Sequence, residues 1–183
     1  PIAGKIVVVV GTGTLGSSMA KLVAPLGVNI IGVNKRGRMV EGCSKVITID
    51  KIDSVLPGAD FLYLALPETP ETKNLINRKR LDMLKPTCGI VNIGRQSAMD
   101  YDALCEKLTK NEIAGAILDV FSQEPIEENS KLWNIPNLFI TPHVSSDDNG
   151  NYVKLTLDIF IKNLKLFIEN KELDNQVNKK LGY

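Results

Sequence analysis

Three side chains in the second half of the sequence, each following an apolar run, have chemistry that fits one reaction: Arg95, Glu124 and His143. Histidine is the side chain whose ordinary pKa lies nearest neutrality, so His143 is the candidate proton donor. A nearby carboxylate stabilises imidazolium, which suits Glu124 to orient the ring. Arg95 could hold a substrate carboxylate and polarise the adjacent carbonyl. Together they would serve hydride transfer between a nicotinamide and a hydroxyl carbon.

Each of these side chains also has an ordinary structural explanation. A lone histidine often caps a helix, a glutamate beside Pro125 can simply face solvent, and an arginine is often ion-paired. Ligands of an open α/β sheet bind beyond the carboxyl ends of its strands, where the three residues would meet around one crevice. We therefore favour the catalytic interpretation of Arg95, Glu124 and His143 only in combination with the glycine turn described next.

A glycine-rich turn, Gly11-Thr12-Gly13-Thr14-Leu15-Gly16, follows the first apolar run and opens a helical pattern. In a dinucleotide site the first glycine allows the tight turn, the second lets backbone approach a pyrophosphate, and the third allows close packing of helix on strand. Gly11, Gly13 and Gly16 occupy those positions. Glycines alone are weak evidence, but a strand before them and a helix after them favour dinucleotide binding over a chance turn.

The residues after the second apolar run indicate which dinucleotide binds. NAD sites normally place an acid about 20 residues beyond the glycines, where it binds the ribose 2′-hydroxyl. Asn34 stands there instead, followed by Lys35, Arg36 and Arg38, which could pair with a 2′-phosphate. The alternative is a solvated basic loop. We favour NADP over NAD.

Apolar runs alternate with amphipathic segments along most of the chain, which predicts an α/β fold: a Rossmann-type, doubly wound parallel sheet in three α/β/α layers. The spacing predicts helices over Leu15–Leu26 (ended by Gly27), near Asp50–Leu56, over Arg78–Leu84 and after an N-cap at Asp100. Strands are predicted at Lys5–Val10, Val28–Val33, Val46–Ile49, Phe61–Leu66, Cys88–Ile93, within Ile113–Val120, and at Leu138–Thr141.

A long C-terminal helix is predicted over Asn151–Asn170. Its apolar residues lie on more than one side, so it needs a second covering surface, from another domain or another subunit, unless it is a central core helix. We expect residues 1–150 to form a dinucleotide-binding domain and residues 151–183 to form a C-terminal helix and tail.

Composition excludes several other classes of protein. The chain has 183 residues, 22 basic and 21 acidic side chains, three cysteines and one histidine. Near-zero net charge argues against nucleic-acid binding. The scattered cysteines and single histidine lack the spacing of a metal site or disulfide framework. No apolar run approaches the ~20 residues that span a bilayer. We therefore expect a soluble, cytoplasmic protein without a metal.

Ordered motifs extend over nearly the whole chain. They are Gly11–Gly16, Leu66–Thr72, Val91–Arg95, Asp119–Phe121 with Glu124-Pro125, Leu132-Trp133 with Pro136-Asn137, Thr141–His143, and Gly182-Tyr183. With this set the chain resembles the cofactor-binding domain of the D-isomer-specific 2-hydroxyacid dehydrogenases. The sequence departs from the family pattern at Gln96, where a glycine often follows the arginine, and at Val144–Asp148, where the family has smaller residues.

The resemblance implies a Rossmann-type domain in which Arg95, Glu124 and His143 act on a 2-oxoacid or 2-hydroxyacid. It also implies cofactor contacts: Thr14 and Leu15 with the pyrophosphate, Leu66 and Ile93 along the cofactor, Asp119 near the nicotinamide amide and Ser146 beside the ring.

Members of this family carry a second, substrate-binding domain, formed mostly by residues before the glycine-turn strand. Only Pro1 to Gly4 precede that strand here. We therefore expect residues 1–183 to correspond to a cofactor domain whose C-terminal segment returns to a substrate domain, to form a homodimer, and to show little turnover alone. Two alternatives stay open: a nicotinamide-sensing, corepressor-like interaction protein of the same family, and another dehydrogenase class on the same scaffold.

Overall fold

The computed structural model of the protein describes residues 1–148 and 150–178, so the Gly182-Tyr183 motif lies outside the described residues. The chain divides into two compact units, residues 1–143 and residues 144–183. This division comes earlier than the one expected after residue 150. That the second unit leads to a substrate domain stays a prediction.

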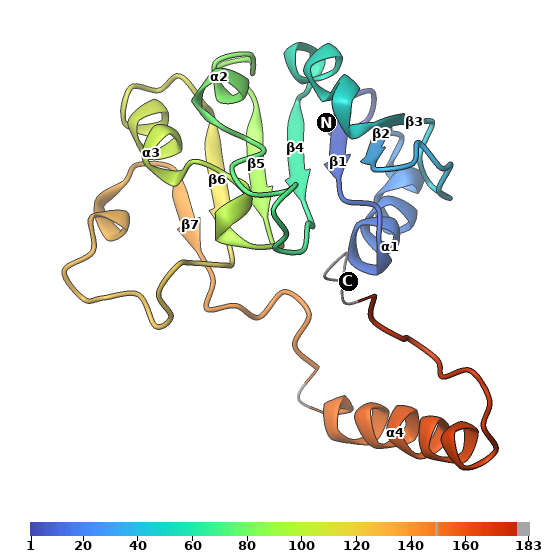
Figure 1. Ribbon diagram of the computed structural model, residues 1–183. Coiled ribbons are helices and arrows are strands. Elements are labelled where there is room, and N and C mark those ends of the chain that lie inside the picture. The colour runs from blue at the N-terminus through green and yellow to red at the C-terminus, as the bar shows by residue number, and fades with distance from the viewer. Residues whose placement is uncertain (149, 179–183) are drawn as a thin grey trace. The chain divides into compact units, whose positions relative to one another are not determined.

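A seven-stranded sheet with the order β3-β2-β1-β4-β5-β6-β7 forms the centre of the first unit. Every neighbouring pair is parallel, which confirms the predicted Rossmann-type sheet. All strands therefore end at one edge, as the arrowheads of Figure 1 show. The strands are β1 Ile6–Val10, β2 Asn29–Asn34, β3 Lys45–Thr48, β4 Phe61–Leu64, β5 Gly89–Asn92, β6 Gly115–Leu118 and β7 Leu138–Ile140.

The helices of this unit are short. They are α1 Thr14–Val23, α2 Arg78–Leu81 and α3 Tyr101–Thr109, with 3₁₀ turns η1 Ala24–Leu26, η2 Ile49–Ser54, η3 Leu56–Gly58, η4 Gln96–Ala98 and η5 Lys131–Asn134. Gly27, in the left-handed conformation, ends η1 as expected. The side chain of Asp100 accepts a bond from the amide of Ala103, which confirms the predicted N-cap.

Three predicted helices were wrong in type or length. The α-helix expected over Leu15–Leu26 ends at Val23, and its last residues form the 3₁₀ turn η1. The helix expected over Asp50–Leu56 is the pair of 3₁₀ turns η2 and η3. The helix expected over Arg78–Leu84 ends at Leu81. After Leu81 the amides of Met83 and Leu84 donate to the carbonyls three residues back, those of Arg80 and Leu81, so the segment continues as tighter turns rather than as α-helix.

The main core lies between one sheet face and the helices α2 and α3. Leu62 and Ile90 of the sheet and Leu81 and Leu104 of these helices are at most 1% exposed in this cluster. On the other face α1 packs over β1 and β2, where Val9 and Ala20 are buried. The apolar pattern thus correctly places helices on both faces of the sheet.

The face covered by α1 also carries a row of apolar side chains farther along the sheet. Tyr63, Val91, Ile117 and Phe139 are aligned by the strand register across β4 to β7. Ile117 is 43% exposed and Phe139 is 67% exposed, so the described part of the first unit does not cover this end of the row.

The second unit contains one helix, α4 Tyr152–Ile168, within the range predicted for it. None of its residues is buried within the described structure, and its large apolar side chains include Val153, Phe160 and Phe167 at 60–69% exposed. After the helix the chain turns back, and the amide of Asp174 donates to Asn163 Oδ1 at 2.8 Å. Among the described helices, none has the length and apolar character needed to cross a bilayer.

Candidate functional site

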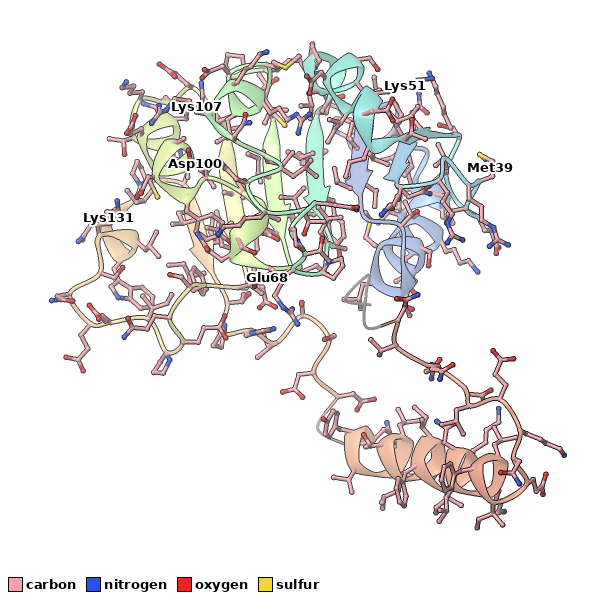
Figure 2. The ribbon with its side chains drawn as sticks, in the orientation of Figure 1. Met39, Lys51, Glu68, Asp100, Lys107 and Lys131 are labelled. Carbon is pink, nitrogen blue, oxygen red and sulfur yellow. The ribbon has the colours of Figure 1, made fainter. Side chains whose placement is uncertain are left out.

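The motifs singled out in the sequence gather at the carboxyl edge of the sheet. Glu68 follows β4, Arg95 follows β5, Glu124 follows β6 and His143 follows β7, so parallel strand pairing brings these segments to the same edge. Figure 2 shows Glu68 at that edge. Strand order reverses between β1 and β4, which is the position where open α/β sheets bind dinucleotides.

The glycine turn connects β1 to the N-terminus of α1. Gly11 has φ +93°, and a Cβ there would lie 2.5 Å from the carbonyl oxygen of Ala65, so only glycine fits. Gly13 is the N-cap of α1, where no side chain caps the helix and a Cβ would meet nothing within 4 Å. The first turn of α1 contains no acidic residue. This open helix terminus fits an anionic pyrophosphate.

Asn34 joins the end of β2 to the glycine turn. Its side-chain nitrogen donates to Thr12 Oγ1 and to the carbonyl of Arg38, both at 2.9 Å. Its side-chain oxygen accepts from the amides of Arg36 and Arg38, both at 3.1 Å. Both hydrogens and the oxygen of the Asn34 side-chain amide are therefore occupied by hydrogen bonds that shape the loop.

The three basic residues of this loop differ in their surroundings. Both carboxylate oxygens of Glu71 accept from Lys35 Nζ at 2.8 Å. Arg36 and Arg38 are exposed, and neither guanidinium forms an ion pair with any residue of 1–148 or 150–178. Of the three, Arg36 and Arg38 therefore have the charge available for an added phosphate.

His143 and Glu124 form a hydrogen-bonded pair. His143 Nδ1 lies 2.8 Å from Glu124 Oε2, and Glu124 Oε1 accepts from the amide of Phe121 at 2.8 Å. The bond from His143, and then the bond from Phe121, lower the pKa of Glu124 from its usual value. The side chain of His143 is 43% exposed and that of Glu124 is 36% exposed. His143 has φ +56°, in the left-handed region.

A cavity of about 420 Å³ brings the three predicted catalytic residues together. Arg95, Glu124 and His143 all line it. Arg95 Nη1 donates to the carbonyl of Gly94 at 2.7 Å, and Arg95 is otherwise exposed. The cavity thus places the guanidinium of Arg95 beside the hydrogen-bonded pair of His143 and Glu124.

Other residues of this cavity were not predicted as site residues. They are Glu68, Gln96, Ser97, Val120, Phe121 and Ser122. Glu68 comes just after β4, so the rule that pointed to Arg95 would also have found it. The residue type of Phe121 did not indicate a role in the site, because it is the backbone amide of Phe121 that bonds Glu124.

The remaining predicted contacts have the following places. Asp119, 1% exposed, accepts a bond from Thr141 Oγ1. Leu66 is buried, Ile93 is half-buried, and Thr14 and Leu15 are exposed at the start of α1. Ser146 belongs to the second unit and is exposed. Their cofactor contacts stay predictions.

Comparison with known proteins identifies the class of this domain. Residues 1–145 match the family described as D-isomer specific 2-hydroxyacid dehydrogenase, NAD binding domain. The chain is 35% identical over 151 residues to a glyoxylate reductase of Thermococcus onnurineus, which covers 81% of this chain and 44% of that protein.

Two solved structures are similar over almost the whole chain. A D-isomer specific 2-hydroxyacid dehydrogenase from Xanthobacter autotrophicus, in complex with NADPH and MES, has TM-score 0.90 and 30% identity, covering 98% of this chain and 73% of that one. An NADPH-dependent glyoxylate/hydroxypyruvate reductase from Sinorhizobium meliloti, in complex with NADP and sulfate, has TM-score 0.89 and 29% identity, covering 98% and 57%.

The chain therefore belongs to the D-isomer specific 2-hydroxyacid dehydrogenases, and residues 1–145 form the NAD-binding domain of that family. It covers 44% of the Thermococcus relative and 27% of a D-3-phosphoglycerate dehydrogenase of Synechocystis, to which it is 35% identical over 156 residues.

Proposed function

We propose that the protein containing this chain is an NAD(P)-dependent D-2-hydroxyacid dehydrogenase that interconverts a small 2-oxoacid and its 2-hydroxyacid. The observation that carries the proposal is the 2.8 Å contact between His143 and Glu124 in one cavity with Arg95. The names of relatives, glyoxylate reductase among them, support a small substrate and favour an enzyme over a nicotinamide-sensing interaction protein.

His143 is the proposed acid in the direction of reduction. Its Nδ1 faces Glu124, so Nε2 is the ring nitrogen that would give a proton to the carbonyl oxygen of the substrate. Glu124 stays ionised because its pKa is lowered, and it would stabilise the imidazolium before transfer. A reduced nicotinamide, when bound, supplies the hydride.

Arg95 is the proposed carboxylate-binding residue. Its guanidinium can hold the substrate carboxylate by charge-assisted hydrogen bonds and polarise the adjacent carbonyl. This fixes the carbonyl carbon relative to His143, and such orientation is a large part of catalysis. Glu68 lines the same cavity and adds negative charge there, which would disfavour a second anionic group on the substrate.

The proposed cofactor is NADP in preference to NAD. Arg36 and Arg38 would hold the 2′-phosphate, on a loop shaped by Asn34, while Lys35 is held by Glu71. No acid occupies the end of β2 to bind a ribose hydroxyl. The solved relatives in complex with NADPH and NADP support this choice.

We further propose that the protein is a cytoplasmic homodimer and that residues 151–183 lead to a substrate-binding domain. The exposed apolar side chains of α4 support a covering partner.

Two measurements test the proposed function. The first is titration of the 183-residue chain with NADPH and NADH, where tighter binding of NADH would contradict the cofactor assignment. The second is reduction of glyoxylate, hydroxypyruvate, pyruvate and phosphohydroxypyruvate by the protein that contains this chain together with the proposed substrate-binding domain, and by the His143→Asn variant of that protein. Equal rates for the two proteins would overturn the role of His143, and failure to bind either dinucleotide would overturn the whole proposal.

A further inference from the structure

Tyr101, the first residue of α3, lies between the two loops that carry Arg95 and Glu124. Its side chain is almost entirely buried, at 8% exposed for the residue. The hydroxyl accepts from Asn92 Nδ2 at 3.1 Å and donates to the carbonyl of Val120 at 2.9 Å. The hydroxyl of this one residue is therefore hydrogen-bonded both to the carboxyl end of β5 and to the segment just after β6.

The bond toward β5 reaches the backbone that presents Arg95. Asn92 is fully buried, and its Nδ2 also donates to the carbonyl of Arg95 at 3.1 Å. Its Oδ1 accepts from the amide of Gly94 at 3.0 Å. With Tyr101 present, both side-chain amide hydrogens of Asn92 have acceptors, one of them the carbonyl of Arg95 in this turn.

The contacts toward β6 reach the backbone that presents Glu124. Val120 directly precedes Phe121, whose amide donates to Glu124 Oε1 at 2.8 Å. The rings of Tyr101 and Phe121 also meet edge to face, with centroids 6.3 Å apart and planes at 81°. Burial raises the pKa of Tyr101 above its usual value, so the hydroxyl keeps the proton that it donates.

We infer that Tyr101 is a positioning residue that fixes the separation between the guanidinium of Arg95 and the pair formed by Glu124 and His143. This inference rests on the proposed function. The carboxylate and the carbonyl of a 2-oxoacid are adjacent, so the groups that bind them must be held at one spacing. A shift of about 1 Å in such a site can cost two orders of magnitude in rate.

The test compares Tyr101→Phe with the matched variant Tyr63→Phe in the 183-residue chain. Tyr63 is half-buried on β4 and does not line the catalytic cavity. The probe is oxalate, whose neighbouring carboxylates imitate the oxygens of a 2-oxoacid. Because the chain has one histidine, the Hε1 proton of His143 gives a single signal that reports oxalate binding by nuclear magnetic resonance.

With NADPH bound, we expect Tyr101→Phe to weaken oxalate binding about tenfold, the effect of one net hydrogen bond, and to leave NADPH affinity unchanged. Tyr63→Phe should change neither. Unchanged oxalate affinity in Tyr101→Phe would overturn the inference. So would an equal loss of oxalate and NADPH affinity with a lower melting temperature, which is the result of a merely structural role.

Amide hydrogen exchange supplies a readout that needs no substrate. The amides of Gly94 and Phe121 should exchange faster together in Tyr101→Phe, since each is bonded to a side chain in the loops that Tyr101 joins. If oxalate fails to shift the His143 signal in the unmodified chain, oxalate binding requires the proposed substrate-binding domain, and the proposed function is decided by the dinucleotide titration and the reduction assay. The inference on Tyr101 is then decided by exchange alone, and unchanged exchange at both amides would overturn it.

Discussion

A Cβ on Gly16 would lie 1.9 Å from the carbonyl oxygen of Gly11, so α1 packs directly on the backbone of the turn before it. We expect Gly16→Ala to lower the free energy of unfolding by about 3 kcal/mol, because backbone cannot yield as a flexible side chain does. Denaturant unfolding measures this change. Wild-type stability in Gly16→Ala would mean that α1 can move off the turn.

Gly13→Ala is the matched variant at the same turn. A Cβ at Gly13 meets nothing within 4 Å, and its φ of −70° suits alanine. We expect a loss of no more than about 1 kcal/mol, the difference between glycine and alanine at an N-cap. NADPH binding should nevertheless fall sharply, since the methyl group would occupy the approach to the pyrophosphate. Retained affinity for NADPH, measured by fluorescence titration, would place the pyrophosphate elsewhere.

The basic loop after β2 allows a test of cofactor choice by charge. Replacing both Arg36 and Arg38 by alanine should weaken NADPH binding by about tenfold or more and leave NADH binding unchanged, because only NADPH carries the 2′-phosphate. Lys35→Ala is the control, since Glu71 already holds that ammonium group. An equal loss of affinity for NADPH and NADH in the double variant would show that these arginines do not bind the 2′-phosphate.

Asp60 should dominate the response of the fold to acid. It accepts bonds from Lys85 Nζ at 2.7 Å and from the amide of Ile6 at 2.8 Å, and these contacts lower its pKa to about 2. A lowered carboxyl pKa stabilises the folded state above the ordinary value of about 3.9, and the stabilisation is lost as pH falls toward 2.

We therefore expect Asp60→Asn to melt at a lower temperature than the wild type near neutral pH, and the difference to shrink as the pH approaches 2. Melting curves recorded across this range by circular dichroism measure the effect. A constant difference at every pH would show that the variant acts through packing rather than through charge.

The exposed apolar face of α4 predicts association of the chain. We expect Phe160→Asp combined with Phe167→Asp to reduce self-association in sedimentation experiments, since both rings are at least 60% exposed on the helix. Lys165→Asp is the control, because it alters charge without removing apolar surface. Equal association of the wild type and the double variant would assign the contact to another surface.

Local patterns in the sequence predicted most of the sheet. The β-branched run Ile6–Val10 and the glycine turn after it predict β1 and the start of α1 to within one residue, because period and turn chemistry act over a few neighbours. The length of α2 was harder to judge from the sequence. Its apolar spacing continues past Leu81, but in the folded chain the amides of Met83 and Leu84 donate to carbonyls three residues back, and the α-helix ends there.

The contacts within the site could be predicted only in part. Motifs that follow strands placed Arg95, Glu124 and His143 at one edge, since parallel pairing brings strand ends together. The hydrogen bond between Asn34 and Thr12 and the two hydrogen bonds of the Tyr101 hydroxyl could not be predicted. Each depends on the approach of segments distant in sequence, and neither residue type favours that particular partner.

The left-handed backbone at His143 narrows the choice of residues at that position. Asparagine and aspartate, like histidine, adopt φ near +56° with little strain, whereas β-branched residues are strongly disfavoured there. A homologous chain that had lost the imidazole without changing its fold would therefore most readily carry asparagine or glycine at this position. The backbone conformation at position 143 therefore limits which residues can replace the histidine during evolution. This limit is separate from the chemistry of the imidazole.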